Sequence, residues 1–351
     1  MNRKIFFIFL LLIIGCSTST TTSKSAQVNV YVGSEGLTAE FAKTAPPPRV
    51  FEQSSFPILI KIRNKGAYSV GVSRAGILAI GREKDYVPEI TLEPNPKMGQ
   101  RGDILLFGVE GKTKINPKGD ELIAAITAKT SKLDPQSENK ESTITATLCY
   151  PYQTLLSTSV CIDPDIGELR PSKKACNVKE ISFNTGQGAP IAVTRIEPQM
   201  IPEGDIIKPQ FLIFVENKGK GSPANINSFQ RLCVKDPSIV DASPLTQDEI
   251  KNAWNVAFLR AYTSGKGVGD KGIQLICCPN IDGQCPENDN NPDKIAGFIR
   301  FRDKKDFVRC TFKNEIKKTD DAFTSPLRIE IDYGYVQTIA DTFLIQKPIK
   351  Y

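Results

Sequence analysis

The residues best suited to covalent chemistry are nine cysteines, and the chain has no histidine to assist them. Without histidine, Ser-His-Asp and Cys-His nucleophile systems and histidine-ligated metals are excluded. Catalysis would have to rely on carboxylates, lysine, tyrosine or thiols. No paired carboxylates or Cys-x-x-Cys motif supplies that chemistry by pattern, so the sequence favours a protein that is not an enzyme.

Cys16 stands directly after a short apolar run. Residues 1–4 form a basic head, residues 5–14 are all apolar, and Gly15 precedes the cysteine. This order is typical of an export signal, and the run is too short for a membrane-spanning helix of roughly 20 residues. The sequence Ile-Ile-Gly-Cys at its end resembles a lipobox, in which the cysteine receives a lipid thioether and becomes the first mature residue.

We therefore expect a signal peptide at 1–15 and a lipid on Cys16. The chain would then be exported and anchored to the extracellular (or periplasmic) face of a membrane. A plain signal peptide with an incidental cysteine is the alternative.

The other cysteines suit disulfide formation. An even number in an exported chain predicts up to four bridges. Cys149 and Cys161 flank a predicted hairpin and could pair across it, which would leave Cys176 to bridge to the second half. The candidates are Cys149, Cys161, Cys176, Cys233, Cys277, Cys278, Cys285 and Cys310.

Two metal sites can be weighed from side-chain spacing. Cys277, Cys278 and Cys285 do not have the paired spacing of a zinc site. Residues 280–294 are rich in the oxygen ligands that calcium prefers, but their order does not match an EF-hand loop. A solvated loop is the preferred interpretation, and no metal or cofactor is assigned. The weak calcium candidates are Asp282, Glu287, Asp289 and Asp293, with Asn291 beside them.

Three further features carry little chemistry. Arg101-Gly102-Asp103 fits an exposed turn, and the Gly-rich stretch 265–272 lacks the ending of a phosphate-binding loop. The formal net charge of +6 comes from scattered Lys and Arg residues rather than a basic run. We therefore expect no nucleic-acid partner.

The chain reads mainly as strands. Residues 28–32 and 56–62 alternate apolar and polar positions, the period of a half-buried strand, and Asn64-Lys65-Gly66 is a turn signal. The residues 28–32 are also a candidate exposed edge for strand addition. Residues 144–152 and 155–162 resemble a closing hairpin.

The second half repeats this order. Residues 211–215 are followed by Asn217-Lys218-Gly219, and each half ends in a Tyr-x-Tyr sequence. Two signals in the same order indicate a duplicated module. Tyrosines late in an immunoglobulin-like sandwich often bury the ring and cap a backbone group. The candidates for this structural role are Tyr150, Tyr152, Tyr333 and Tyr335.

The repeat predicts a mostly β protein with two immunoglobulin-like β-sandwich modules in tandem. A Ser/Thr-rich tether would span 16–27, the first sandwich 28–162, a junction 163–189 and the second sandwich 190–351. The second sandwich would hold an insertion at about 230–310 with Cys-rich loops and one helix.

The predicted helix begins at a capping box, Thr246 to Glu249. Apolar residues then recur at helical spacing to Ala261, and 264–265 would end the helix. Trp254 would pack the helix onto the second sandwich.

Several of these motifs resemble adhesion-related CARDB-type domains, which are immunoglobulin-like modules repeated in prokaryotic envelope proteins. The resemblance lies in residues 56–66 and 211–219. Residues 47–52 and 149–154 are similar to uncharacterised archaeal envelope proteins with such modules. The resemblance implies an immunoglobulin-like fold and an envelope location, and it supplies no catalytic residues. The segment 230–310 departs from a simple module of this kind.

The sequence thus predicts a non-catalytic envelope lipoprotein with a structural or adhesive role. Its partners would be the membrane, through the lipid, and a protein or another envelope component. Two alternatives remain: a ligand-capture lipoprotein of a transport system, which needs a two-lobed cleft, and a carboxylate-based hydrolase of envelope polysaccharide.

Overall fold

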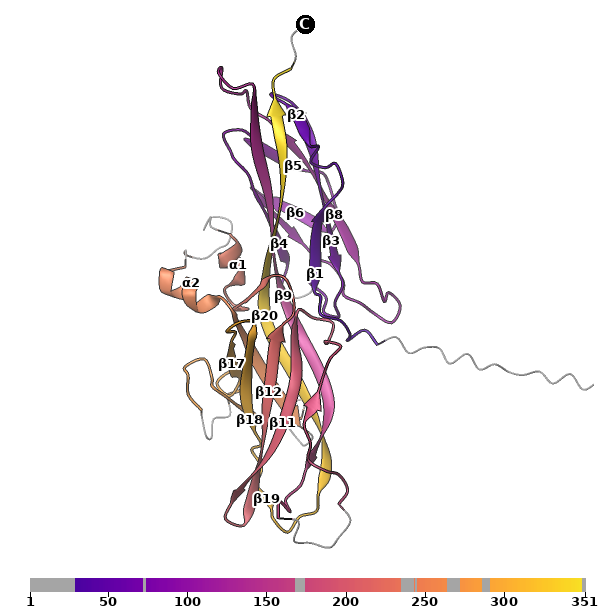
Figure 1. Ribbon diagram of the computed structural model, residues 1–351, viewed down its shortest axis with the longest axis vertical. Helices are drawn as coiled ribbons and strands as arrows, with labels where there is room; N and C mark the ends of the chain where they lie inside the picture. Colours follow the sequence, from indigo (N-terminus) through magenta and orange to yellow (C-terminus); the bar gives the residue numbers. More distant parts are fainter. Residues whose placement is uncertain are drawn as a thin grey trace, which may run out of the picture.

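The computed structural model describes most of the chain beyond the N-terminus. The described residues are 29–71, 74–167, 174–234, 243, 245–263, 272–285 and 291–348. The predicted signal peptide 1–15, Cys16, the tether 16–27 and the Gly-rich residues 265–271 lie outside them. The chain is mostly β, as predicted, and its elements form an elongated molecule (Figure 1). We call its middle, around Pro151 and Gly334, the waist.

Two long strands run through the whole length of the molecule. β9 (Asn139–Ile162) and β20 (Phe323–Gln346) pair antiparallel along all 24 residues of each. The N-terminal half of β9 lies beside β4 in the first sandwich, whereas the N-terminal half of β20 lies beside β14 in the second. Each long strand therefore leaves one sandwich and enters the other (Figure 1). We call this pair the spine.

Each sandwich packs a sheet of its own on the sheet that contains the spine. The first has the order β1 (Leu37–Phe41), β3 (Ser55–Asn64), β8 (Glu121–Lys129) and β5 (Glu89–Leu92). The second has the order β10 (Ile181–Ser182), β11 (Ile191–Glu203), β12 (Ile206–Asn217), β18 (Lys305–Thr311) and β16 (Ile276–Cys278), with β19 (Ile316–Lys317) beside β12.

The spine sheet is completed by shorter strands on both sides. They are β2 (Arg49–Phe51), β4 (Gly76–Gly81), β6 (Met98–Arg101), β7 (Ile104–Phe107), β13 (Ser222–Ala224), β14 (Val256–Thr263), β15 (Ile273–Gln274) and β17 (Gly297–Arg300). Alternation explains the sandwich strands: Ile58, Ile60 and Ile62 of β3 are fully buried, and the residues between them are not. One apolar cluster runs from the first sandwich through the waist into the second.

The predicted hairpin at 144–162 is wrong, because β9 continues without a turn through Pro151. Pro151 lies opposite Gly334 in the spine. Leu344 of β20 donates its N–H to Pro48, on the side away from β9. Gly334 is an even number of residues from Leu344, so its backbone groups also face away from β9, and those of its partner Pro151 face away from β20. The missing N–H of Pro151 therefore removes no bond from the spine.

The predicted helix is shorter than expected. Both halves of the capping box form, and Thr246 is the N-cap of α2 (Gln247–Ala253). The chain then turns into β14, where Val256, Ala257, Leu259 and Ala261 are fully buried. Apolar residues stand on both faces of β14, because Phe258 alternates with the buried residues and its ring packs on Phe298. The sequence therefore lacks a clear period-2 pattern, and its apolar positions matched helical spacing by coincidence. Trp254 caps α2 and packs at the waist against a small apolar cluster that includes Phe229.

Two other expectations concern the ends and divisions of the modules. The predicted strand at 28–32 does not form over its described residues, 29–32. The predicted bounds of the first sandwich (28–162), the junction (163–189) and the second sandwich (190–351) stay a prediction. In space, the spine joins the two sandwiches. Residues 230–310 contain α1 (Phe229–Cys233) in part, α2 and the strands β14 to β18.

Candidate functional site at the waist

Four tyrosines meet on one face of the spine at the waist. Tyr150 pairs with Tyr335 and Tyr152 with Tyr333, so all four side chains project to the same side. Each is at most 1% exposed, and the ring centroids of neighbours lie 5.6–6.2 Å apart. The four residues predicted as structural tyrosines thus form a single cluster, which we call the tyrosine quartet.

Two members of the quartet fix the Asn-Lys-Gly turns. The Tyr152 hydroxyl donates to Asn64 Oδ1 at 3.2 Å, and the Tyr335 hydroxyl donates to Asn217 Oδ1 at 3.0 Å. Each asparagine oxygen also accepts from the glycine N–H two residues later, at 3.1 Å in both turns. Each amide nitrogen donates to the carbonyl four residues later. The two turns therefore have the same hydrogen-bond pattern.

The other two members hold the first residue of an outer strand. The Tyr150 hydroxyl accepts from Leu37 N at 3.2 Å, and the Tyr333 hydroxyl accepts from Ile191 N at 3.4 Å. Leu37 pairs with Asn64 and Ile191 pairs with Asn217, so these positions are equivalent in the two sandwiches. The two sandwiches thus repeat not only the sequence order of the duplicated module but also its individual hydrogen bonds.

Burial keeps the quartet neutral. Desolvation raises the pKa of Tyr150, Tyr152 and Tyr333 well above the ordinary value, and it raises that of Tyr335 to about 12. At neutral pH all four hydroxyls are therefore protonated and act as hydrogen-bond donors and acceptors. Their chemistry at the waist is structural, because they hold the turns of both sandwiches against the spine.

The opposite face of the spine at the waist is covered by the helical segment. Phe229 of α1 lies against Gly334, where a Cβ atom would collide with its ring. Cys233 at the end of α1 forms a disulfide with Cys149 of β9. In Figure 1 the helices α1 and α2 project sideways at this level.

All eight candidate cysteines of the described region form disulfides, but not in the expected pairs. The pairs are Cys149–Cys233, Cys161–Cys176, Cys277–Cys310 and Cys278–Cys285. The proposed Cys149–Cys161 pairing is wrong, because the spine continues where the hairpin was expected and separates the two residues along one strand. The expected bridge from Cys176 to the second half is also wrong; Cys149 makes the bridge between early and late parts of the chain.

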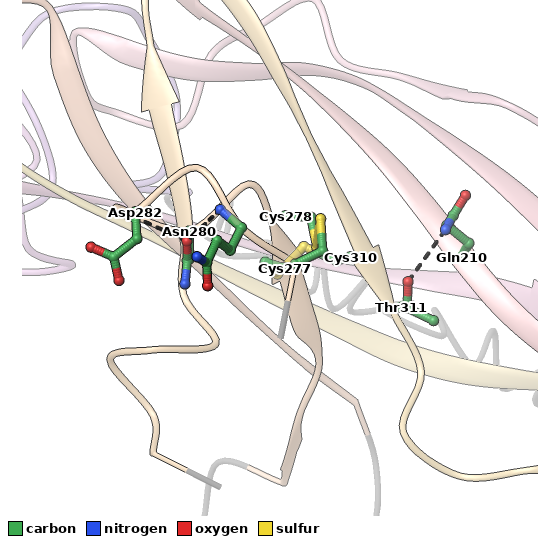
Figure 2. The surroundings of a disulfide bond; sticks show 9 residues. Gln210, Cys277, Cys278, Asn280, Asp282, Cys310 and Thr311 are labelled. Carbon is green, nitrogen blue, oxygen red and sulfur yellow. Dashed lines mark hydrogen bonds between the residues drawn. A yellow bond between two sulfur atoms is a disulfide. The ribbon is translucent and has the colours of Figure 1, made fainter. Parts of the chain in front are cut away.

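The Cys277–Cys310 bridge joins directly opposed residues of β16 and β18, and Cys278 turns to the adjacent loop (Figure 2). In that loop Asn280 Oδ1 accepts from the backbone N–H of Asp282 and Gln284. Of the calcium candidates, Glu287 and Asp289 lie outside the described residues. Within the described part of the chain, no group of three or more Cys, Asp or Glu side chains is placed to hold a metal ion.

A groove of about 690 Å³ opens beside the quartet on the first sandwich. The strand β1 forms one wall with Leu37 and Ala39, and β20 forms another with Gln337 and Ile339. The turn containing Lys218 and Lys220 closes its lower end. Sequence reasoning missed this groove, because its walls come from segments about 300 residues apart. The signal that could have found it is the repeat, if extended upstream from residues 56–66 and 211–219 to β1 and β11.

The comparisons with known proteins give little beyond this geometry. No family model and no curated protein matches the chain. Solved structures that align with it include the C-terminal domain of the Streptococcus agalactiae AgI/II polypeptide BspA, at 6% identity over 89% of this chain and 100% of that one, with a TM-score of 0.22. A partial N-terminal region of an enterococcal surface protein aligns at 8% identity over 90% and 86%, with a TM-score of 0.18. Scores this low support no functional argument.

The described helices are short. None of them is long and apolar enough to cross a membrane.

Arg101 and Asp103 lie at the β6–β7 turn, where the Asp103 carboxylate pairs with Arg82 and Lys84. The RGD aspartate is thus engaged within the sandwich.

Proposed function

We propose that this chain is a non-catalytic, lipid-anchored envelope protein that acts as a rigid rod with a structural or adhesive role. The observation that carries the proposal is the spine, which passes through both sandwiches and is fixed at the waist by the tyrosine quartet. A continuous paired sheet resists bending between the sandwiches. A rod of fixed shape is suited to presenting loops at a distance from a surface.

Two features support an exported location. Disulfides persist mainly in oxidising compartments, and the described chain contains four. The lipobox-like sequence ending in Cys16 supplies an anchor. Gly33, near the first described residue, exchanges backbone hydrogen bonds with Thr185 and Gly188 at the waist. The anchored segment would therefore join the rod at its waist rather than at a tip.

The spine weighs against the ligand-capture alternative. A two-lobed capture protein closes its lobes about a hinge that a few residues absorb. Here two paired 24-residue strands cross between the sandwiches and leave no such hinge.

The proposal is tested by comparing wild-type and Cys16→Ala chains in the organism that encodes the protein. We expect the wild type in the membrane fraction, with an intact mass that begins at Cys16 and includes a lipid. The variant should be released. Protease added to intact cells should remove the wild type, and loss of the protein should reduce attachment or envelope integrity. A lipid-free mass, or a variant that stays in the membrane, would contradict the anchor.

A further inference from the structure

The repeat provides an internal comparison for the groove on the first sandwich. Leu37 of β1 and Ile191 of β11 occupy equivalent positions, as their pairing with Asn64 and Asn217 shows. Two residues further along, Ala39 is therefore equivalent to Val193. Four residues before Leu37 and Ile191, Gly33 and Gln187 stand at the same distance in sequence.

In the second sandwich the edge of β11 is covered by the chain itself. β10 pairs antiparallel with β11, where Ile181 lies opposite Ile196. The side chains of Ile181 and Phe183 pack against the apolar core. The Gln187 amide then completes the cover, because it accepts from Val193 N at 2.8 Å and donates to Val193 O at 3.1 Å. Val193 and Ile196 are fully buried as a result.

In the first sandwich no described strand covers the equivalent edge, although the Gln337 amide of β20 donates to Leu37 O at 3.2 Å at its start. Among the described residues, β1 pairs with β3 alone. Gly33 has no side chain to imitate the Gln187 amide, and Ala39 and Phe41 are only partly buried. Leu37 directs its N–H and C=O away from β3 to the Tyr150 hydroxyl. By alternation, the backbone groups of Ala39, which lines the groove, and of Phe41, which lies beyond it, also face away from β3.

We infer that the free edge of β1 binds an extended segment of a partner protein, which adds as an antiparallel strand. This strand would repeat the contacts of residues 181–187. Its backbone would pair with Ala39 and Phe41, and apolar side chains at alternate positions would enter the groove beside Ile339. Backbone pairing supplies affinity in strand addition, and the pockets for alternate side chains supply specificity. The inference names a partner class for the proposed interaction role and rests on that role.

The chain itself is poorly suited to fill this groove. Its own segment with the required alternation, at 181–183, already pairs with β11 and is held nearby by the Cys161–Cys176 bridge. A second copy would offer the same occupied segment. Residues 16–28 are Ser/Thr-rich and contain one large apolar residue, Val28, where 181–183 contains two. A partner must therefore supply the strand.

The test uses the detergent-solubilised full chain and a fluorescent peptide with the sequence of residues 178–188. We expect saturable binding of one peptide per chain, measured by fluorescence anisotropy. A peptide in which serine replaces the residues equivalent to Ile181 and Phe183 should bind at least about tenfold more weakly, or about 1.4 kcal/mol. Hydrogen exchange should slow at Ala39 and Phe41 when the wild-type peptide is added.

A matched pair of variants places the site. Ala39→Pro removes an outward N–H that β3 does not use, a substitution that edge strands tolerate. It should weaken peptide binding by about tenfold. Ser157→Pro lies in the other sandwich, on the side of β9 that faces away from β20 and has no strand partner there among the described residues, and it should leave binding unchanged. Absence of binding, or equal binding to the Ala39→Pro chain, would overturn the inference. In cells, an Ala39→Pro chain that no longer binds the peptide but supports attachment as well as the wild type would also overturn the inference. The proposed function would be unaffected by that result.

Two other occupants would also overturn the inference. If deletion of residues 17–28 is required for peptide binding, the groove is filled by the chain's own N-terminal segment. If the full chain sediments as a dimer that Ala39→Pro dissociates, the groove is filled by a second copy.

Discussion

At the residue scale, the waist is organised by two asparagines and four tyrosines. Asn64 and Asn217 use both ends of their side-chain amides within their own turns, and their oxygens still accept from Tyr152 and Tyr335. Buried polar groups of this kind are costly when unpaired. The turns and the spine therefore depend on each other.

Removing one hydroxyl should reveal this dependence. Tyr335→Phe leaves Asn217 Oδ1 with one donor fewer, and it leaves Gly221 N without its 3.0 Å acceptor. We expect the free energy of unfolding, measured with denaturant, to fall by about 1–3 kcal/mol. Tyr86→Phe is the control, because its hydroxyl contacts Asp134 at the exposed surface. Equal losses for the two variants would contradict the role assigned to the quartet.

Alkaline pH should destabilise the protein through the same residues. Burial raises the pKa of Tyr335 to about 12, against about 10 for an unfolded tyrosine. Between these values the unfolded chain has lost more protons than the folded one, so the stability falls as the pH rises. We expect the quartet to ionise together with the loss of β circular dichroism. Ionisation of every tyrosine near pH 10 in a still-folded chain would be the opposite result.

At the scale of elements, local signals were predictable and distant pairings were not. The alternation of β3 and β12, the Asn-Lys-Gly turns and the capping box at Thr246 all depend on neighbouring residues, and the structure confirms them. The continuation of β9 through Pro151 depends on a partner strand more than 170 residues away. No local pattern encodes that partner, and the sequence around Pro151 resembled a hairpin.

The same limit explains the disulfides and the groove. The number of cysteines predicted that they pair, but the pairing follows from which strands lie together. Cys149 meets Cys233 because α1 folds back onto the spine, a tertiary contact with no local signature. The walls of the groove come from β1 and β20, at opposite ends of the described chain.

The Cys149–Cys233 bridge should contribute more stability than a short one. It closes a loop with a sequence separation of 84 residues, against 7 for Cys278–Cys285. In the chain-entropy model, a disulfide that closes a longer loop removes more entropy from the unfolded chain and so stabilises the folded protein more. Replacing Cys149 and Cys233 by alanine should lower the free energy of unfolding by about 2–4 kcal/mol and expose α1 amides to hydrogen exchange. An equal or larger loss on replacing Cys278 and Cys285 would argue against this assignment.

At the scale of the whole molecule, the spine converts a repeat along the chain into one continuous body. The first sandwich is completed by the C-terminal half of β20, and the second by the C-terminal half of β9. This exchange holds the sandwiches in a fixed relation, which a tether between independent modules would not do. The strand and turn patterns predicted a mostly β protein, which the structure confirms. The lipid anchor inferred from the lipobox-like sequence stays a prediction, and the rod-like shape required the structure.

The most direct measurement is size-exclusion chromatography of a chain cut by an inserted protease site within 163–189, before and after reduction. The spine predicts that the two fragments elute together in both conditions, because the β9–β20 pairing holds them without any disulfide. Urea should separate the reduced fragments but not the oxidised ones, which Cys149–Cys233 still links. If the reduced fragments separate without denaturant, the two halves are independent modules and the account of a continuous spine is wrong.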